Sequence, residues 1–250
     1  MTKENTRNSV WKSPLQAPIL KDNEIHVWRA NLELSLPKIE RLTALLTSDE
    51  IAKANRFRFP QHKRRFIVAR GILRQLLGDY LTVAPHSINF AYEPRGKPML
   101  TKVKNTALQF NISHSQEYAL LGFTRKHLIG VDLEYQRSMP DSLKIAKRFF
   151  SAREFEMLKD AAEDERAKLF FQLWTAKEAY LKALGTGLSS SLASIEIAFD
   201  LHQYPYIQSL EEEKNINWSL YPCTPAKSYI GAIAVNTSLS SPQTFFWHWQ

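Results

Sequence analysis

The chain has 250 residues, a formal net charge of +8 at pH 7, 44% hydrophobic and 23% charged residues, and a single cysteine, Cys223. One cysteine excludes an intramolecular disulfide framework and fits a reducing compartment. The first ten residues lack the apolar core of a signal peptide, and no apolar run approaches the length of a membrane span. We therefore expect a cytoplasmic protein without a membrane partner.

Residues 1–23 are polar, contain Pro14 and Pro18, and predict a loose or extended lead-in. Alternating apolar residues predict a strand at 24–34. A capping-type start at Ser48-Asp49-Glu50 predicts a helix, which Phe59-Pro60 separates from a longer helix ending near Leu81. A short strand at 88–92 and a turn at 93–98 are expected next.

Positive charge is concentrated in this first part of the chain. A basic stripe of this kind indicates an anionic partner such as nucleic acid, a phosphorylated cofactor, an acidic protein or a membrane surface. A solvated helix face has the same composition, so charge alone leaves both interpretations open. The stripe contains Lys53, Arg56, Arg58, Lys63, Arg64, Arg65, Arg70 and Arg74.

Three apolar runs separated by polar turns predict a β-meander at 108–113, 118–124 and 128–135. Because strands and helices then recur in the same order, we expect an α+β fold with two halves, residues 24–125 and 126–250, divided near Arg125-Lys126. Phe245, Trp247 and Trp249 share one face of the last strand, where a role in the core is favoured over a binding platform. The second half is expected to contain helices at 141–150, at 151–161 and from Glu163, and strands at 194–199, 217–221, 229–235 and 244–249.

The stretch Phe170–Leu184 has the apolar spacing of a helix that packs on one face, and Gly185-Thr186-Gly187 provides a C-terminal stop. Lys177 falls inside the apolar stripe, where its ammonium group must find a partner. Glu178 and Lys182 lie one turn apart at the edge of the stripe. Such a pair is ordinary on a surface, but a charge within the apolar face makes a functional site worth considering.

Asp132 and Glu134 are two residues apart on a predicted strand and project from the same face. With Glu178 they would form an all-oxygen set suited to Mg²⁺, whereas no cluster of cysteine and histidine has zinc spacing. Solvated carboxylates at a strand edge remain the alternative. Small polar side chains at Asn111-Ile112-Ser113-His114-Ser115 suit phosphate oxygens or an Asx-type turn. Lys97 offers an ammonium group on a common type of tight turn.

Five motifs occur in one order along the chain: Gly96-Lys97-Pro98, Asn111 to Ser115, Ile129 to Glu134, Lys147 to Ser151, and Trp174 to Glu178 followed by Lys182. The ordered set is highly specific, although no single motif would be. From roughly Lys53 to Leu188 the chain closely resembles the Sfp-type 4′-phosphopantetheinyl transferases. The lead-in and the region after Ser190 carry no matching motif.

The resemblance implies a pseudo-two-fold α+β enzyme of two similar halves that enclose coenzyme A. It implies transfer of the phosphopantetheine arm to a serine of an acidic apo acyl or peptidyl carrier protein, with release of adenosine 3′,5′-bisphosphate. A monomer is expected if the two halves already pair within one chain. By motif position, Asp132, Glu134 and Glu178 would hold Mg²⁺, Lys182 would contact the pyrophosphate, and Lys53, Lys97, Ser113 and His114 would contact the cofactor's phosphates.

The resemblance implies catalytic roles for Glu178, Lys182 and Asp132. Glu178 would help to deprotonate the serine, with Glu154 as a second candidate base. Three rival hypotheses remain: a nucleic-acid-binding module, a catalytically idle scaffold that binds carrier proteins, and another magnesium-dependent phosphoryl transferase. The first gives the carboxylates no role, since they would repel phosphates. A basic enzyme would attract both coenzyme A and an acidic carrier, so we expect no nucleic-acid partner.

Overall fold

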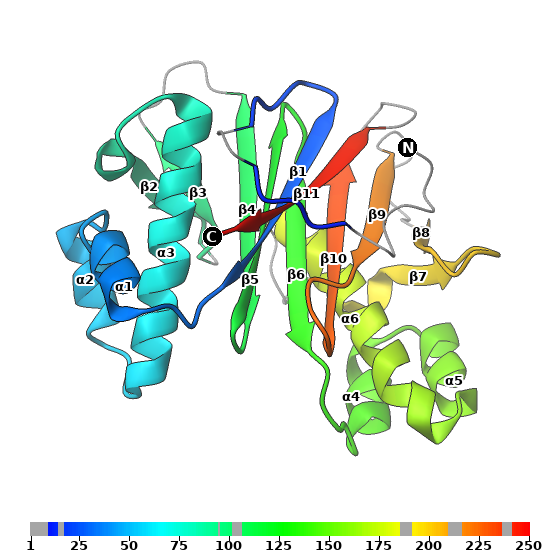
Figure 1. Ribbon diagram of the computed structural model, residues 1–250. Helices are drawn as coiled ribbons and strands as arrows, with labels where there is room; N and C mark the ends of the chain where they lie inside the picture. The colour runs from blue at the N-terminus through cyan, green and yellow to red at the C-terminus, as the bar shows by residue number, and fades with distance from the viewer. Residues whose placement is uncertain are drawn as a thin grey trace.

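One series of strands and helices occurs twice along the chain (Figure 1). The computed structural model describes residues 10–14, 18–94, 96–101, 107–185, 192–209, 217–236 and 242–250. The first series is β1 (Glu24–Asn31), α1 (Leu36–Thr43), α2 (Ser48–Ala54), α3 (Pro60–Leu81), β2 (Asn89–Tyr92), β3 (Pro98–Thr101), β4 (Leu108–Ser115) and β5 (Tyr118–Arg125). The second is β6 (Ile129–Tyr135), α4 (Ser142–Phe149), α5 (Ala152–Asp160), α6 (Glu163–Leu184), β7 (Glu196–Phe199), β8 (Pro205–Ser209), β9 (Trp218–Cys223) and β10 (Tyr229–Asn236).

Strand pairing is also repeated. The strand order β1-β5-β4 in the first half matches β6-β10-β9 in the second, and the hairpin β2-β3 matches β7-β8. A final strand, β11 (Gln243–Trp249), pairs in parallel with the outer edge of β1. The predicted α+β fold of two similar halves is therefore confirmed. Because β11 returns to the first sheet, the division into residues 24–125 and 126–250 as domains stays a prediction.

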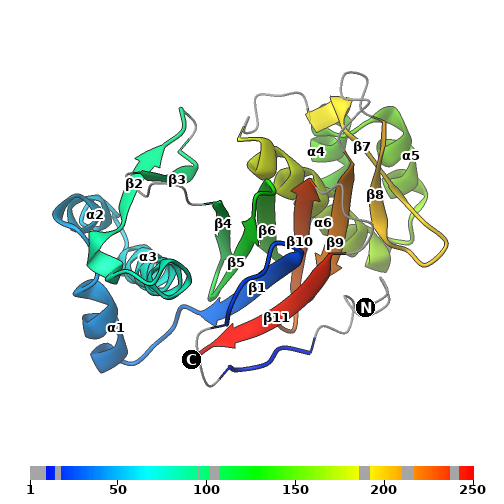
Figure 2. The same ribbon diagram turned by 90° about the horizontal axis from the view of Figure 1, so that it is seen from above.

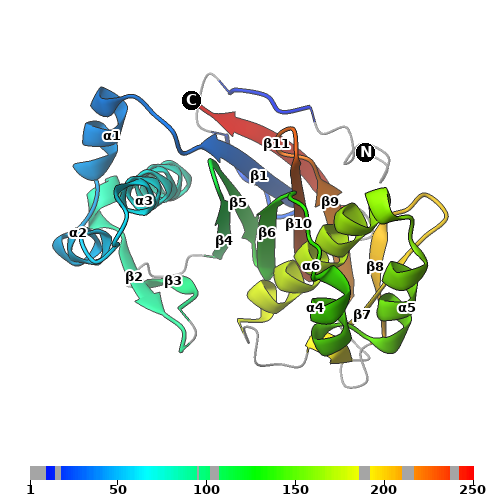
Figure 3. The same ribbon diagram turned by 90° about the horizontal axis from the view of Figure 1, so that it is seen from below.

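The two halves pack as four layers, with the sheets inside and the long helices α3 and α6 outside (Figures 2 and 3). One apolar cluster joins α3 to its sheet, and a second joins α6 to the other sheet. The third cluster, which includes Val27, Leu120, Val131 and Ile233, lies between the two sheets. Each sheet is thus covered on both faces, which explains the strongly apolar strands. Within the described residues, no helix combines the length and apolar composition needed to cross a bilayer.

Several predicted elements are confirmed with small shifts in their ends. Thr47 and Glu50 form a capping box at α2, and Pro60 begins α3. Helix α6 ends at Gly185, whose φ of 75° suits a residue without a Cβ. Within the predicted lead-in, Lys12 forms an isolated parallel bridge with Trp247 of β11. Thr186 and Gly187 lie outside the described residues.

The β-meander is wrong in its third strand. β4 and β5 pair as expected, but β6 pairs with β10, which is almost 100 residues later in the chain. Strand β6 presents Val131 and Leu133 to the cluster between the sheets, so its apolar pattern matches that of a meander strand. Helix α1 and strands β3 and β8 were not predicted from the sequence. All three are short, and α1 contributes only one buried residue, Leu42.

Helix α6 lies directly on β6 because Gly130 has no side chain. A Cβ atom at Gly130 would lie 1.9 Å from the Ala179 carbonyl oxygen and 2.4 Å from the Ala183 nitrogen. Gly130 shares its face of β6 with Asp132 and Glu134, since side chains alternate along a strand. The close approach therefore brings the acidic residues of β6 toward the polar edge of α6.

We predict that Gly130→Ala destabilises the protein by about 1–3 kcal/mol, because the methyl group must push α6 away from β6. Urea unfolding followed by tryptophan fluorescence measures the change. A variant as stable as the wild type would show that α6 does not depend on this close contact.

Candidate active site

Strand β6, helix α6 and strand β4 bring four predicted site residues together. The Lys182 ammonium lies 2.6 Å from Asp132 Oδ1 and donates a hydrogen bond to Ser113 Oγ at 2.9 Å. Ser113 Oγ in turn donates to Asp132 Oδ1 at 2.9 Å. Glu178 lies one helical turn before Lys182 and feels the charges of both Asp132 and Glu134. The residues predicted from separate motifs thus form one cluster.

β4 and β6 belong to different sheets and are joined through side chains of β4. Asn111 Oδ1 accepts the Val131 backbone N–H at 2.9 Å, and Ser115 Oγ accepts that of Tyr135 at 3.1 Å. Ser115 Oγ also donates to Glu134 Oε2 at 3.0 Å. The sequence suggests phosphate binding or an Asx-type turn for the segment 111–115, whereas Asn111 and Ser115 here connect β4 to β6. The signal for them was the polar alternation at positions 111, 113 and 115 of an otherwise apolar strand.

The three carboxylates influence one another electrostatically in a partly buried setting. Burial, followed by the charge of Asp132, raises the pKa of Glu178 to about 7, while Lys182 opposes the shift. Burial and Asp132 also raise the pKa of Glu134. Asp132 Oδ2 and Glu178 Oε1 are buried and have no hydrogen-bond partner among the described residues. A buried carboxylate oxygen without a partner is costly, so both atoms call for a cation or a proton.

The chemistry of this cluster fits a hard divalent cation. Its donors are carboxylate oxygens, the ligands that Mg²⁺ prefers, and two of these oxygens have no partner among the residues described above. The described parts of the chain contain no three His, Cys, Asp or Glu side chains already grouped to hold a metal ion. The Mg²⁺ ligand set Asp132, Glu134 and Glu178 therefore stays a prediction.

Two further predicted residues lie beside this cluster. Lys97 Nζ donates to the carbonyl oxygen of Ala183, one residue after Lys182, at 2.9 Å. Burial lowers the pKa of Lys97. Desolvation by neighbouring protein atoms, followed by the positive charge of Lys182, lowers the pKa of His114. Lys97, Ser113 and His114 therefore all lie near Lys182 or the end of α6.

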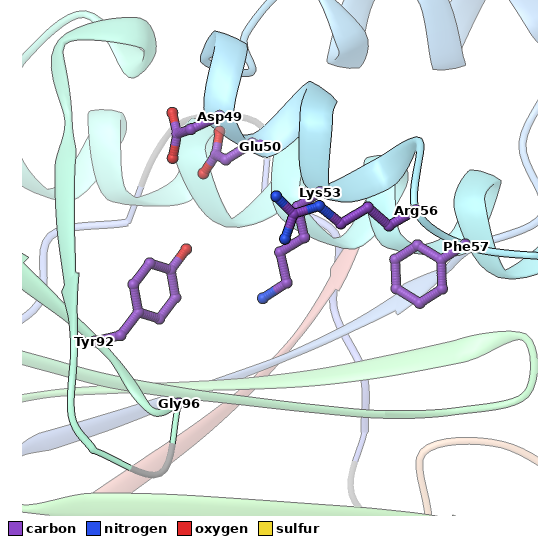
Figure 4. A pocket seen from close by; sticks show the side chains of 7 residues that line it. All are labelled: Asp49, Glu50, Lys53, Arg56, Phe57, Tyr92 and Gly96. Atoms are coloured by element: carbon purple, nitrogen blue, oxygen red, sulfur yellow. The ribbon is translucent and has the colours of Figure 1, made fainter.

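Lys53 lies in a separate pocket of about 630 Å³ between α2 and the β2–β3 hairpin. Figure 4 shows its ammonium group between α2 and Tyr92. It lies 5.3 Å from the Tyr92 ring centroid and 5.6 Å from that of Phe66. Gly96 lines the pocket as well, and the next residue, Lys97, bonds to Ala183 near the end of α6. The hairpin therefore connects the Lys53 pocket to α6. The lining residues are Asp49, Glu50, Lys53, Arg56, Phe57, Tyr92 and Gly96.

The basic stripe is not one exposed face. Arg65, Arg70 and Arg74 are buried. Arg74 Nε lies 2.7 Å from Glu50 Oε2, and Arg70 Nε lies 3.5 Å from Glu50 Oε1. Arg65 pairs with Glu33 and Glu117. Paired arginines hold elements together and are not available to nucleic-acid phosphates, which weakens the rival hypothesis.

Lys177 has the partner that its position in the apolar stripe requires. Its ammonium group, fully buried, lies 2.6 Å from Glu154 Oε2 and donates to the carbonyl oxygens of Leu192 and Ile195. Glu154 is also fully buried and accepts the Ile197 N–H, so it binds α5, α6 and β7 together. The suggestion of Glu154 as the general base is therefore wrong, because its oxygens are already bonded and cannot reach a substrate.

Comparison with known proteins identifies the family. Residues 128–234 match the model of the 4′-phosphopantetheinyl transferase superfamily, and residues 32–125 match that of the 4′-phosphopantetheinyl transferase N-terminal region. The 4′-phosphopantetheinyl transferase HetI of Nostoc sp. is 43% identical over 92% of this chain and 94% of its own. The chain belongs to the 4′-phosphopantetheinyl transferase family.

A second relative extends the match to the Sfp type. The 4′-phosphopantetheinyl transferase Sfp of Bacillus subtilis is 32% identical over 68% of this chain and 73% of its own. A putative 4′-phosphopantetheinyl transferase of Synechocystis sp. is 42% identical over 68% of this chain and 70% of its own. The family and the transferase activity predicted from the five motifs are thus confirmed.

The raised pKa of Glu178 predicts a pH-dependent stability. The folded protein holds the Glu178 proton more tightly than the unfolded chain, whose ordinary pKa is 4.5. Wild-type stability should therefore fall relative to Glu178→Gln as the pH rises from 5 to 8, by roughly 2–3 kcal/mol. Urea unfolding in EDTA at both pH values measures this. Glu165→Gln, an exposed change on the same helix, should show no such pH trend.

The buried Lys177–Glu154 pair predicts a large loss of stability when only one of the two charges is removed. Lys177→Met leaves the buried Glu154 carboxylate without its cation and should cost about 3–5 kcal/mol. Adding Glu154→Gln removes the stranded charge and should recover part of this loss. Urea unfolding of both variants tests the pair, and a double variant no more stable than the single one would contradict it.

Proposed function

We propose that Asp132, Glu134 and Glu178 hold Mg²⁺ against the pyrophosphate of coenzyme A while its 4′-phosphopantetheine group moves to a serine of an apo acyl or peptidyl carrier protein. The observation that carries this proposal is a pair of buried oxygens, Asp132 Oδ2 and Glu178 Oε1, that have no hydrogen-bond partner within the part of the chain that the structure describes. They lie in a cluster whose cation, Lys182, is bonded to Asp132 Oδ1. A second cation would satisfy both oxygens.

The reaction joins the carrier serine oxygen to the phosphorus that bears the pantetheine arm. The bond from that phosphorus to the bridging oxygen breaks, and adenosine 3′,5′-bisphosphate leaves with the electron pair. Such displacements depend on alignment and charge neutralisation more than on a covalent protein intermediate. When bound, Mg²⁺ would stabilise negative charge on the phosphates. Lys182, 29% exposed at its side chain, would contact the pyrophosphate. Glu178 would accept the serine proton.

Coenzyme A binding is assigned to the cationic side of the site. Ser113, His114 and Lys97 lie near Lys182 and would contact the phosphates of the cofactor. Lys53 would contact a phosphate from the neighbouring pocket, which the β2–β3 hairpin connects to Lys97. An acidic carrier protein and the cofactor would both be drawn to a protein of net charge +8.

The remaining parts of the proposal are that the protein acts in the cytoplasm and as a monomer. Support for a monomer comes from the apolar cluster between the two sheets, where the halves cover each other. Support for a reducing compartment comes from Cys223, the single cysteine, which is buried. An idle scaffold would have no need for unpartnered carboxylate oxygens, which cost stability.

Incubation of the protein with coenzyme A, Mg²⁺ and an apo carrier protein tests the proposal by mass spectrometry of the carrier. We expect Asp132→Ala or Glu178→Ala to lower the transfer rate by at least about 100-fold without unfolding the protein. Asp22→Ala, which removes an exposed carboxylate paired with Lys126, serves as the matched control and should leave the rate unchanged.

The carriers should come from fatty acid, polyketide and peptide pathways. If none gains the phosphopantetheine mass, the transferase proposal fails. If transfer proceeds equally well in EDTA, or if Asp132→Ala keeps the wild-type rate, the metal assignment fails. Salt-sensitive binding to DNA or RNA with no transfer would favour the nucleic-acid hypothesis instead.

A further inference from the structure

The turn between β4 and β5 is held from the second half of the molecule by Tyr229, the first residue of β10. The Tyr229 hydroxyl donates to Glu117 Oε2 at 2.6 Å and accepts the Glu117 backbone N–H at 3.2 Å. Two hydrogen bonds to one turn residue fix both its side chain and its backbone. The phenol is thus a specific contact between the second half and this turn.

Arg65 of α3 holds the same turn from the first half. Its guanidinium donates to Glu117 Oε1 at 3.0 Å, to Gln116 Oε1 at 3.2 Å and to Glu33 Oε1 at 2.9 Å. The Arg65 side chain is only 9% exposed, so these hydrogen bonds are largely shielded from solvent. Glu117 therefore lies between a cation from one half and a phenol from the other.

The β4–β5 turn follows directly after Ser115, the last residue of β4 and the first part of the proposed site next to the turn. Gln116 has a φ of 48°, in the left-handed region, directly after Ser115. Ser115 accepts the Tyr135 N–H and donates to Glu134. Tyr135 is also the partner of Tyr229 in the β6–β10 ladder. Tyr229 thus contacts the turn through its hydroxyl and the Glu134 strand through its backbone.

We infer that Tyr229 and Arg65 are positioning residues that, through Glu117, hold the serines of β4 against the carboxylates of β6. No backbone ladder joins β4 to β6, which belong to different sheets, so this spacing depends on side chains. The inference rests on the proposed function, because it assumes that these serines and carboxylates form the active site. It adds three residues that none of the five motifs contains.

Tyr229→Phe separates positioning from packing. The ring of Tyr229 contacts those of Tyr118 and Tyr135 edge-on, with centroids 5.0 and 5.2 Å apart, and phenylalanine keeps these contacts. Only the hydroxyl bonded to Glu117 is lost. Tyr118→Phe is the matched control, because it removes a hydroxyl from the same ring cluster but not the one bonded to Glu117.

For Tyr229→Phe we expect the KM for coenzyme A and the Mg²⁺ concentration at half-maximal rate to rise about tenfold, with a smaller change in kcat. Loss of folded protein alone would lower kcat and leave both concentrations unchanged. Hydrogen exchange of the Tyr135 amide should become about tenfold faster, since its acceptor Ser115 is less firmly held. Tyr118→Phe should change neither.

Glu117→Gln provides a second variant, because the Glu117 side chain is 44% exposed and its replacement does not disturb the core. It should raise the same two concentrations. The inference is overturned if Tyr229→Phe, or Glu117→Gln where the former does not fold, behaves like Tyr118→Phe in kinetics and in Tyr135 exchange. If the wild type itself transfers nothing, the proposed function fails, and the exchange rate alone decides the positioning role.

Discussion

Mutual repulsion among Asp132, Glu134 and Glu178, opposed by the single ammonium group of Lys182, is the interaction around which this molecule is arranged. Neighbouring side chains of like charge move apart unless the backbone holds them in place. The absence of a side chain at Gly130 lets α6 lie directly on β6. This contact fixes Asp132 and Glu134 of β6 relative to Glu178 of α6. The apolar clusters on both faces of each sheet supply the free energy that opposes the repulsion.

The proposed site lies where the two repeated units meet. Within each unit, strands join through backbone ladders, but β4 and β6 join through Asn111, Ser113 and Ser115. A ladder would have used up the backbone groups and closed the two sheets into one. A side-chain connection leaves the hydroxyl groups of Ser113 and Ser115 beside the carboxylates of Asp132 and Glu134. This explains why an otherwise apolar strand has small polar residues at alternate positions.

The sequence predicted those features that depend on local chemistry. The capped helix start predicted at Ser48-Asp49-Glu50, the glycine end of α6 and the need of Lys177 for a partner follow from nearby residues. All three are present, with Thr47 as the N-cap of α2. The pairing of β6 with β10 does not follow, because its apolar face packs between sheets and has the pattern of any buried strand. The burial of Arg74 does not follow from the local sequence either, because its acceptor Glu50 lies 24 residues away along the chain. The motifs predicted Asp132, Glu134 and Glu178 as one set, but they contained none of the residues that hold the β4–β5 turn.

Two consecutive residues of α6 show how a functional charge differs from a structural one. Lys177 is fully buried, and its ammonium group has a carboxylate and two carbonyl oxygens as acceptors. Glu178 is less buried, yet one of its oxygens has no partner among the described residues and its pKa is raised to about 7. Since folding alone favours satisfied groups, an unsatisfied carboxylate beside a satisfied lysine is best explained by a ligand that completes it. The incomplete set of contacts, more than the burial of charge itself, is therefore what supports our proposal that the active site lies at this edge of α6.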